Sequence, residues 1–154
     1  MILPVKQNDQ YGGFAELSGL LRIESDALVL EYTLTDDVLG VFNSDVKTLK
    51  IPFAMIEEVR VVKKWFSARF EIYLNRLPKT DKTLTLQKNC LSFTIKKGEL
   101  DQAKSLKSKL MLNVSEEKLR LIESEEENRE PEFQFYTKKA DPEGLKNILR
   151  ENDE

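Results

Sequence analysis

The sequence of 154 residues contains no histidine and only one cysteine, Cys90. The lack of histidine removes the side chain that most often acts as a general base or as a zinc or iron ligand. A single cysteine cannot form an intramolecular disulfide or a thiolate metal cage, and such sparse use is typical of a reducing cytosol. We therefore expect a cytoplasmic protein that holds neither a metal ion nor another cofactor.

Long apolar runs are absent as well. No window approaches the roughly 20 apolar residues that a membrane-spanning helix needs, and residues 1–10 lack the charged start and apolar run of a signal peptide. Glycine and proline are few, at six and five residues, which excludes collagen-like and low-complexity chains. With 40% apolar and 33% charged residues, the chain can form one core of ordinary size.

The net charge of −3 conceals an uneven distribution along the chain. Residues 1–45 carry −6, residues 46–113 carry +9 and residues 114–154 carry −6. A basic centre between acidic ends indicates either a basic surface for anionic partners or neutralisation within the molecule. The sequence pI of about 5.3 argues against a nucleic-acid partner.

Apolar and polar residues alternate through most of the first two thirds of the chain, which is the period of half-buried strands. The pattern predicts seven strands, at residues 13–24, 26–34, 46–51, 56–66, 68–74, 83–87 and 90–95. Ser25-Asp26 predicts a turn, and Lys88-Asn89 predicts a two-residue hairpin turn in which Asn accepts a positive φ more readily than Lys.

The apolar period changes to 3.6 residues after Gly98, which predicts one amphipathic helix of about four turns. Its apolar face comprises Leu100, Ala103, Leu106, Leu110, Met111 and Val114. Ser115 either continues this helix or caps a second one. The chain then divides into an N-terminal extension (1–12), a folded domain (13–114), an acidic helix end and linker (115–132), and a C-terminal tail (133–154).

Seven strands followed by one helix resemble the pleckstrin-homology-like fold, and three stretches resemble its GRAM-like and bacterial members. These stretches are GLLRIESDALVLEY (19–32), VKTLKIPFAMIEEVRVVKKWF (46–66) and LTLQKNCLSFTIKKGELDQAKSLKSKL (84–110). The resemblance implies a mainly β, seven-stranded barrel or sandwich that is capped by the C-terminal amphipathic helix. It also implies a non-catalytic module that binds lipid headgroups, peptides or other proteins.

Members of this family that bind phosphoinositides use basic residues near the first strand and the loop that follows it. In this chain we expect that region to be residues 22–26, which read Arg-Ile-Glu-Ser-Asp. One arginine accompanied by two acids cannot surround a multiply charged phosphate. The region therefore argues against phosphoinositide binding.

A basic stretch around the single tryptophan is the best candidate for a ligand-binding surface. Its candidate residues are Lys47, Lys50, Arg60, Lys63, Lys64, Trp65 and Arg69. Lysines beside an exposed aromatic suit an anionic membrane surface, where each lysine adds about 1 kcal/mol. Alternatively, Trp65 or Phe66 lies in the core and the lysines mark a solvated strand edge.

The last 22 residues contain apolar groups that follow an acidic linker. FQFY at 133–136 resembles a strand, and Asp141-Pro142 predicts the start of a short helix. We expect a short docking tail that packs on its own domain or on a partner. Its docking residues are Phe133, Phe135, Tyr136, Leu145, Ile148 and Leu149.

The sequence offers no combination of side chains typical of a catalytic site. Glu57 and Glu58 are neighbours on a predicted strand and should point to opposite faces, and Cys90 has no histidine to activate it. We predict a non-catalytic binding or scaffolding domain that engages a protein partner or a second copy of itself. The alternative is a peripheral membrane module that binds anionic lipid through a basic strand face, and a small-molecule enzyme is a third, less favoured alternative.

Overall fold

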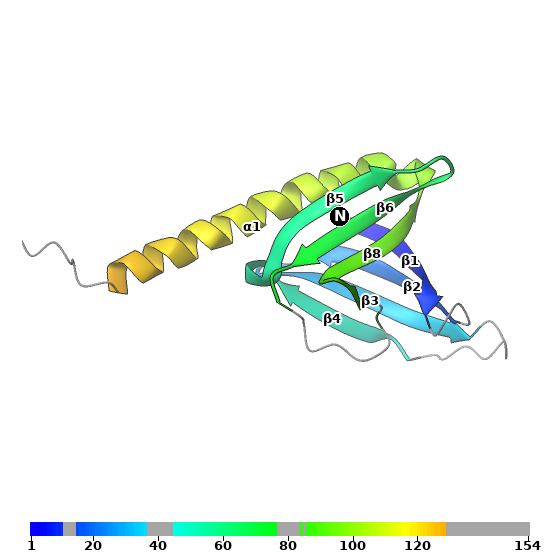
Figure 1. Cartoon of the computed structure of the whole chain (residues 1–154), viewed down its shortest axis with the longest axis horizontal. Coiled ribbons are helices and arrows are strands. Elements are labelled where there is room, and N and C mark those ends of the chain that lie inside the picture. Colours follow the sequence, from blue (N-terminus) through cyan, green and yellow to red (C-terminus); the bar gives the residue numbers. More distant parts are fainter. Residues whose placement is uncertain (11–14, 37–44, 77–83, 85, 129–154) are drawn as a thin grey trace, which may run out of the picture. The chain divides into compact units, whose positions relative to one another are not determined.

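The computed structural model of the chain describes residues 1–10, 15–36, 45–76, 84 and 86–128. In chain order the elements are β1 (Ile2–Gln10), β2 (Ala15–Ile23), β3 (Ala27–Asp36), β4 (Lys47–Pro52), η1 (Phe53–Met55), β5 (Ile56–Lys63), β6 (Ser67–Leu74), β7 (Leu86–Gln87), β8 (Cys90–Lys96), η2 (Lys97–Glu99) and α1 (Leu100–Asn128) (Figure 1). The chain divides into two compact units, Met1–Leu121 and Ile122–Glu154. All the strands belong to the first unit, so the predicted mainly β fold with one C-terminal amphipathic helix is confirmed.

One antiparallel sheet contains all the strands, in the order β4-β3-β2-β1-β8-β6-β5, with β7 paired to β8. The sheet is not closed, because within the described residues β4 pairs only with β3 and β5 only with β6. It therefore forms a sandwich-like arrangement rather than a complete barrel. The predicted docking tail at 133–154 lies outside the described residues.

β1 occupies the place where the sequence predicted an N-terminal extension, so that prediction is wrong for residues 2–10. The strand pairs with β2 without interruption from Ile2 to Gln7, and its Leu3 and Val5 are buried in the core. The described part of the chain therefore contains eight strands rather than the seven predicted. Of the predicted strand 83–87, the structure describes Leu84, Leu86 and Gln87, and the last two form β7.

The junction between β1 and β8 is narrow but reinforced by side chains. The two strands share one backbone residue pair, Lys6 with Thr94. The side-chain amide of Gln7 donates a hydrogen bond of 3.2 Å to the carbonyl of Ser92 on β8. Gln102 of α1 donates to the carbonyl of Ile2, so a second glutamine side chain joins the start of β1 to the helix.

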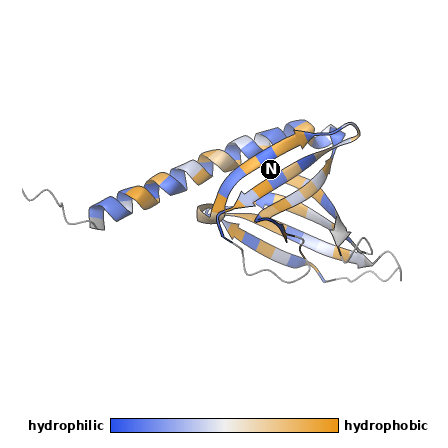
Figure 2. Ribbon diagram, in the orientation of Figure 1, coloured by the Kyte–Doolittle hydropathy of each residue, from blue (hydrophilic) through white to orange (hydrophobic). Residues whose placement is uncertain are grey.

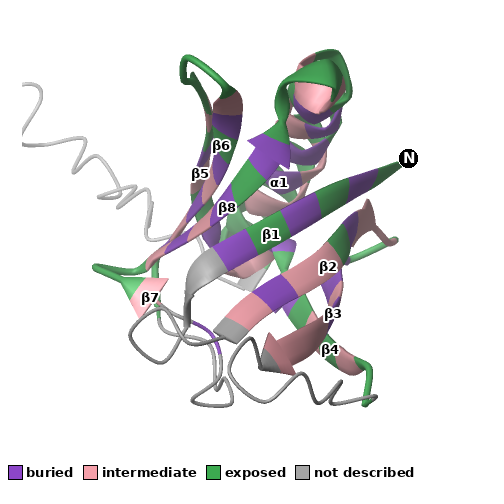
Figure 3. Ribbon diagram, turned by 90° about the vertical axis from the view of Figure 1, so that its right-hand side faces the viewer, coloured by how far each residue is buried: buried purple, intermediate pink, exposed green. Residues whose placement is uncertain are grey.

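The core lies on the inner face of the sheet and along one side of α1. Figure 2 shows the alternation of apolar and polar residues along the strands, and Figure 3 shows that buried positions recur with the same period. The helix contributes four buried residues, Ala103, Leu106, Leu110 and Val114, while Leu100 and Met111 are partly buried against the core. This confirms the predicted apolar face of the helix.

Of the two alternatives at Ser115, the structure shows the continuous helix, since α1 extends to Asn128. Ser115 lies inside it rather than at a new N-terminus, and its hydroxyl donates a 2.8 Å hydrogen bond to the carbonyl of Met111 one turn earlier. From Ser115 to Glu127 none of the helical residues is buried. The first half of α1 therefore packs on the sheet, and the second half makes no contribution to the core.

Both predicted tight turns are present. The amide of Glu24 donates to the carbonyl of Ala27 across Ser25-Asp26 at 2.9 Å. Lys88 and Asn89 have φ values of 50° and 61°, which are the left-handed conformations that a type I′ hairpin turn requires of both central residues.

Replacing Leu110 with Ala should lower the free energy of unfolding by about 2–5 kcal/mol, because the fully buried leucine would leave a cavity. Leu112 supplies the matched control, since it lies on the same helix with its side chain exposed, and Leu112→Ala should change stability by no more than about 0.5 kcal/mol. Urea unfolding of both variants checks this. Equal destabilisation would show that the helix does not close the core.

Candidate functional site

The turn between β5 and β6 projects two aromatic side chains into solvent. The amide of Lys64 donates to the carbonyl of Ser67 at 2.9 Å, so the chain reverses over four residues. Trp65 and Phe66 are 82% and 85% exposed, and their rings meet edge to face with centroids 6.2 Å apart. The alternative in which either residue belongs to the core is therefore excluded. We call residues 63–66 the aromatic tip.

Four lysines surround the aromatic tip. Lys63 and Lys64 belong to it, and the register of Ser67 opposite Lys96 brings the end of β8 alongside. Lys97 follows at once in η2, which leads directly into the first turn of α1. No lysine of this group makes an ion pair within the part of the chain that the structure describes. They form a cationic rim, which we call the tip lysines.

The predicted basic residues on β5 and β6 are engaged by their own sheet. Arg60 donates two hydrogen bonds to Glu58, at 2.8 and 2.7 Å, and its guanidinium lies 4.8 Å from the ring centroid of Tyr73. The hydrogen bonds raise the pKa of Arg60 and lower that of Glu58. Arg69 lies 4.0 Å from Glu71. These two arginines are thus less available to an external anion than Lys63 and Lys64.

Lys47 and Lys50 lie on β4, at the opposite end of the strand order from β5. Lys50 forms a 3.0 Å ion pair with Asp26, and its hydrogen bond is the main reason that the pKa of this aspartate lies below its ordinary value. The seven predicted ligand-binding residues therefore do not form one surface. Lys63, Lys64 and Trp65 stay together at the aromatic tip.

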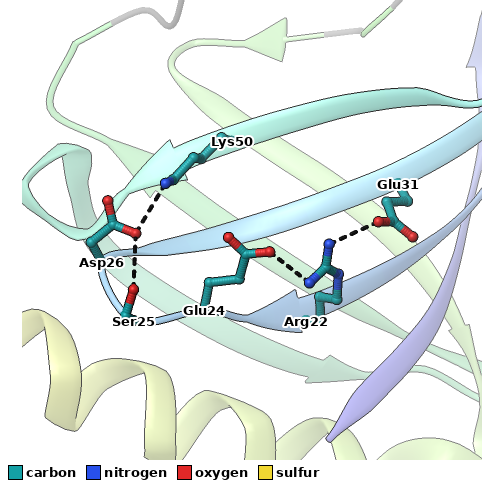
Figure 4. A network of polar contacts seen from close by, with 6 residues as sticks. All are labelled: Arg22, Glu24, Ser25, Asp26, Glu31 and Lys50. Carbon is teal, nitrogen blue, oxygen red and sulfur yellow. Dashed lines mark hydrogen bonds and ion pairs between the residues drawn. The ribbon is translucent and has the colours of Figure 1, made fainter.

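Residues 22–26 join β2 to β3, so the expectation that they follow the first strand is wrong. Figure 4 shows the polar network around this turn. Arg22 lies between two carboxylates, 2.6 Å from Glu24 and 2.8 Å from Glu31, and the hydrogen bond to Glu31 is the largest cause of its raised pKa. Because both carboxylates neutralise the guanidinium, this hairpin offers little attraction to a phosphate.

A groove of about 630 Å³ crosses the outer face of β8, β1, β2 and β3. Its lining is mainly apolar and includes Pro4, Leu20 and Val46, while Phe66 of the aromatic tip lines it as well. Lys96 and Lys97 also belong to the lining. The groove and the aromatic tip therefore share one aromatic residue and two of the tip lysines.

Sequence reasoning missed Lys96 and Lys97 as candidate site residues. The pairing of β6 with β8 brings them beside residues about 30 positions earlier in the chain, and local patterns do not reveal such non-local pairing. The signal that could have found them is their position directly after the last predicted strand. The predicted docking residues in 133–154 lie outside the described part of the chain.

The potential catalytic groups lie in environments that do not favour reactivity. Glu57 is exposed, and Glu58 is held by Arg60. Burial is the main cause that raises the pKa of the Cys90 thiol, and the negative charge of Glu71 raises it further. Among the described residues, no group of three His, Cys, Asp or Glu side chains could hold a metal ion.

Cys90 should react slowly with a thiol reagent at pH 7.5, because a raised pKa leaves a smaller fraction as the reactive thiolate. The rate should be lower in the folded protein than in the urea-unfolded chain. Glu71→Gln should accelerate the reaction, since it removes a negative charge that disfavours the thiolate, and Glu57→Gln serves as the matched control. A folded protein that reacts faster than the unfolded chain would contradict this account.

No helix in the described ranges is long and apolar enough to cross a membrane. Comparison with known proteins finds no matching family model, no similar curated protein and no similar solved structure. The function therefore has to be argued from the aromatic tip, the tip lysines and the groove beside them.

Proposed function

We propose that this chain is a non-catalytic, pleckstrin-homology-like binding module of the cytoplasm that attaches peripherally to anionic membrane surfaces through its aromatic tip. The observation that carries the proposal is the 82% and 85% exposure of Trp65 and Phe66 beside four lysines. Large exposed aromatics on a folded domain mark interaction surfaces. Lysines on the same turn favour a partner surface that is anionic.

The physical contributions of the two residue types are complementary. Trp and Phe rings gain free energy on leaving water, and indole is favoured at the level of lipid headgroups, where its N–H remains hydrated. Each lysine near an anionic surface adds about 1 kcal/mol. An aromatic tip with two exposed rings and the four tip lysines in or beside it therefore suits reversible, salt-dependent attachment.

The non-catalytic and pleckstrin-homology-like parts of the proposal have separate support. A mainly antiparallel β fold followed by one amphipathic helix is the architecture that the sequence resemblance implies, and it supports the second part. The raised pKa of Cys90 and the pairing of Glu58 with Arg60 leave the best candidate nucleophile and carboxylate poorly suited to catalysis.

A protein partner or a second copy of the chain is the second candidate for the ligand. It is favoured by the exposure of Leu112 and Leu119 on α1, seven residues apart and hence on one side of the helix. These leucines lie outside the aromatic tip, so the two candidates predict different sensitive residues.

Lys63→Glu combined with Lys64→Glu should weaken binding to vesicles of phosphatidylcholine with one third phosphatidylserine by roughly tenfold or more, because two attractions become repulsions. Co-sedimentation measures this. Binding of the unmodified chain should fall as salt rises, since the Debye length shortens to about 3 Å at 1 M. Lys109→Glu combined with Lys118→Glu makes the same charge change on α1 and should have a much smaller effect.

Trp65 reports its own insertion because it is the only tryptophan in the chain. Its emission should shift to shorter wavelength on addition of anionic vesicles, and lipids brominated on the acyl chain should quench it. Unchanged emission together with absent co-sedimentation would overturn the membrane proposal. If the mass of the protein in solution then rises with concentration, and Leu119→Glu removes this dependence, the second candidate is supported.

A further inference from the structure

The groove beside the aromatic tip has the size and lining of a small-molecule site. Its volume of about 630 Å³ falls within the roughly 300–1,000 Å³ that ligand pockets occupy. Leu20 is 42% exposed on β2, although the outer face of an antiparallel sheet has no need of apolar groups. Val46, directly before β4, is 65% exposed. An apolar surface is thus left open to solvent along the groove.

Several polar groups of the groove are engaged without a ligand. β2 is paired with β1 and β3, and β3 with β2 and β4, so neither of these two strands offers an unpaired edge to which a peptide strand could add. β1 and β8, which also line the groove, share one residue pair, Lys6 with Thr94. Lys6 already forms an ion pair with Glu16, and Glu31 forms one with Arg22. The floor therefore suits an occupant that requires few hydrogen bonds, such as a hydrocarbon chain.

One end of the groove differs from the rest in charge. Lys96 and Lys97 line it there, next to Phe66, and within the described residues neither makes an ion pair. Glu99 lines the groove as well, and its carboxylate accepts a 3.4 Å hydrogen bond from the backbone amide of Lys96. Two ammonium groups against one carboxylate leave this end with one net positive charge, which complements a single anionic group.

We propose that the groove binds one long-chain anionic amphiphile, with its acidic group at Lys96 and Lys97 and its hydrocarbon chain over Leu20 and Val46. A fatty acid and a single-chain phospholipid share this chemistry. The inference rests on the proposed function in that the aromatic tip brings the groove to the lipid surface from which such a molecule comes. It adds a specific, saturable site to a nonspecific attachment.

Titration calorimetry of the full-length chain with oleate, below the concentration at which oleate aggregates, tests the site. We expect saturable binding with a stoichiometry of one. Leu20→Glu should weaken oleate binding by roughly tenfold or more, because the substitution places a charged carboxylate on the apolar floor where the hydrocarbon chain would lie. Ile122→Glu is the control, since this exposed residue of α1 does not line the groove, and it should leave the affinity unchanged.

Further arms identify the acidic group and its source. Lys96→Glu combined with Lys97→Glu should abolish oleate binding, and dodecylamine, which has the opposite charge, should not bind the unmodified chain. If oleoyl lysophosphatidic acid binds more tightly than oleate, the site belongs to a phospholipid. If oleate binds more tightly, the site belongs to a fatty acid. If inorganic phosphate competes for the site as well as either amphiphile does, the hydrocarbon chain has no role in binding and the proposal is overturned.

Trp65→Ser separates this inference from the proposed function, because Trp65 does not line the groove. The variant should lose vesicle binding and retain oleate binding. If oleate binds without saturation, or if Leu20→Glu and Val46→Glu both fold and bind oleate like the unmodified chain, the groove site is refuted whatever the vesicles show. If the unmodified protein binds oleate but does not bind anionic vesicles, the proposed function alone is refuted.

Discussion

The insertion of β1 between β2 and β8 is the constraint on which the rest of the structure depends. On one side β1 makes a long ladder with β2, and on the other it meets β8 through one residue pair. Its inward residues Leu3 and Val5 join a core that receives side chains from both parts of the sheet. Without β1, the open edges of β2 and β8 would be exposed to solvent, which favours aggregation. Gln7 adds a side-chain hydrogen bond across the short β1–β8 ladder, and Gln102 attaches the start of β1 to α1.

The position of the candidate site follows from the same arrangement. Because β8 lies between β1 and β6, its register with β6 sets Lys96 opposite Ser67, directly after the aromatic tip. The other edge of β8 faces β1, and residues of both strands line the groove. One strand thus links the two surfaces for which we propose lipid contacts. A change in the register of β8 by a single residue would turn its buried Phe93 and Ile95 outward, so the core itself keeps the lysines in place.

The strands and the helix were predictable because their apolar periods are strong, whereas β1 and the aromatic tip were not. β1 contains Pro4 and ends in a polar QNDQ run, and both features argue against a strand inside a sheet. Pro4 is accommodated because the only β1–β8 residue pair in the described part of the chain lies at Lys6. At the aromatic tip, alternation continued through 56–66 would have turned either Trp65 or Phe66 inward. The actual turn at Lys64–Ser67 ends that alternation without any Gly, Pro or Asn to signal it.

Charge in the sequence and charge at the surface proved to be different quantities. The central segment carries +9, yet Lys50, Arg60 and Arg69 each lie beside a carboxylate. Exposed ion pairs of this kind contribute only about 0–1 kcal/mol each to stability. Their larger consequence is that they remove cations from competition for an external anion. Lys63, Lys64, Lys96 and Lys97 make no ion pair within the described residues, and they lie beside two exposed rings. This juxtaposition favours a ligand with an anionic group directly next to an apolar one.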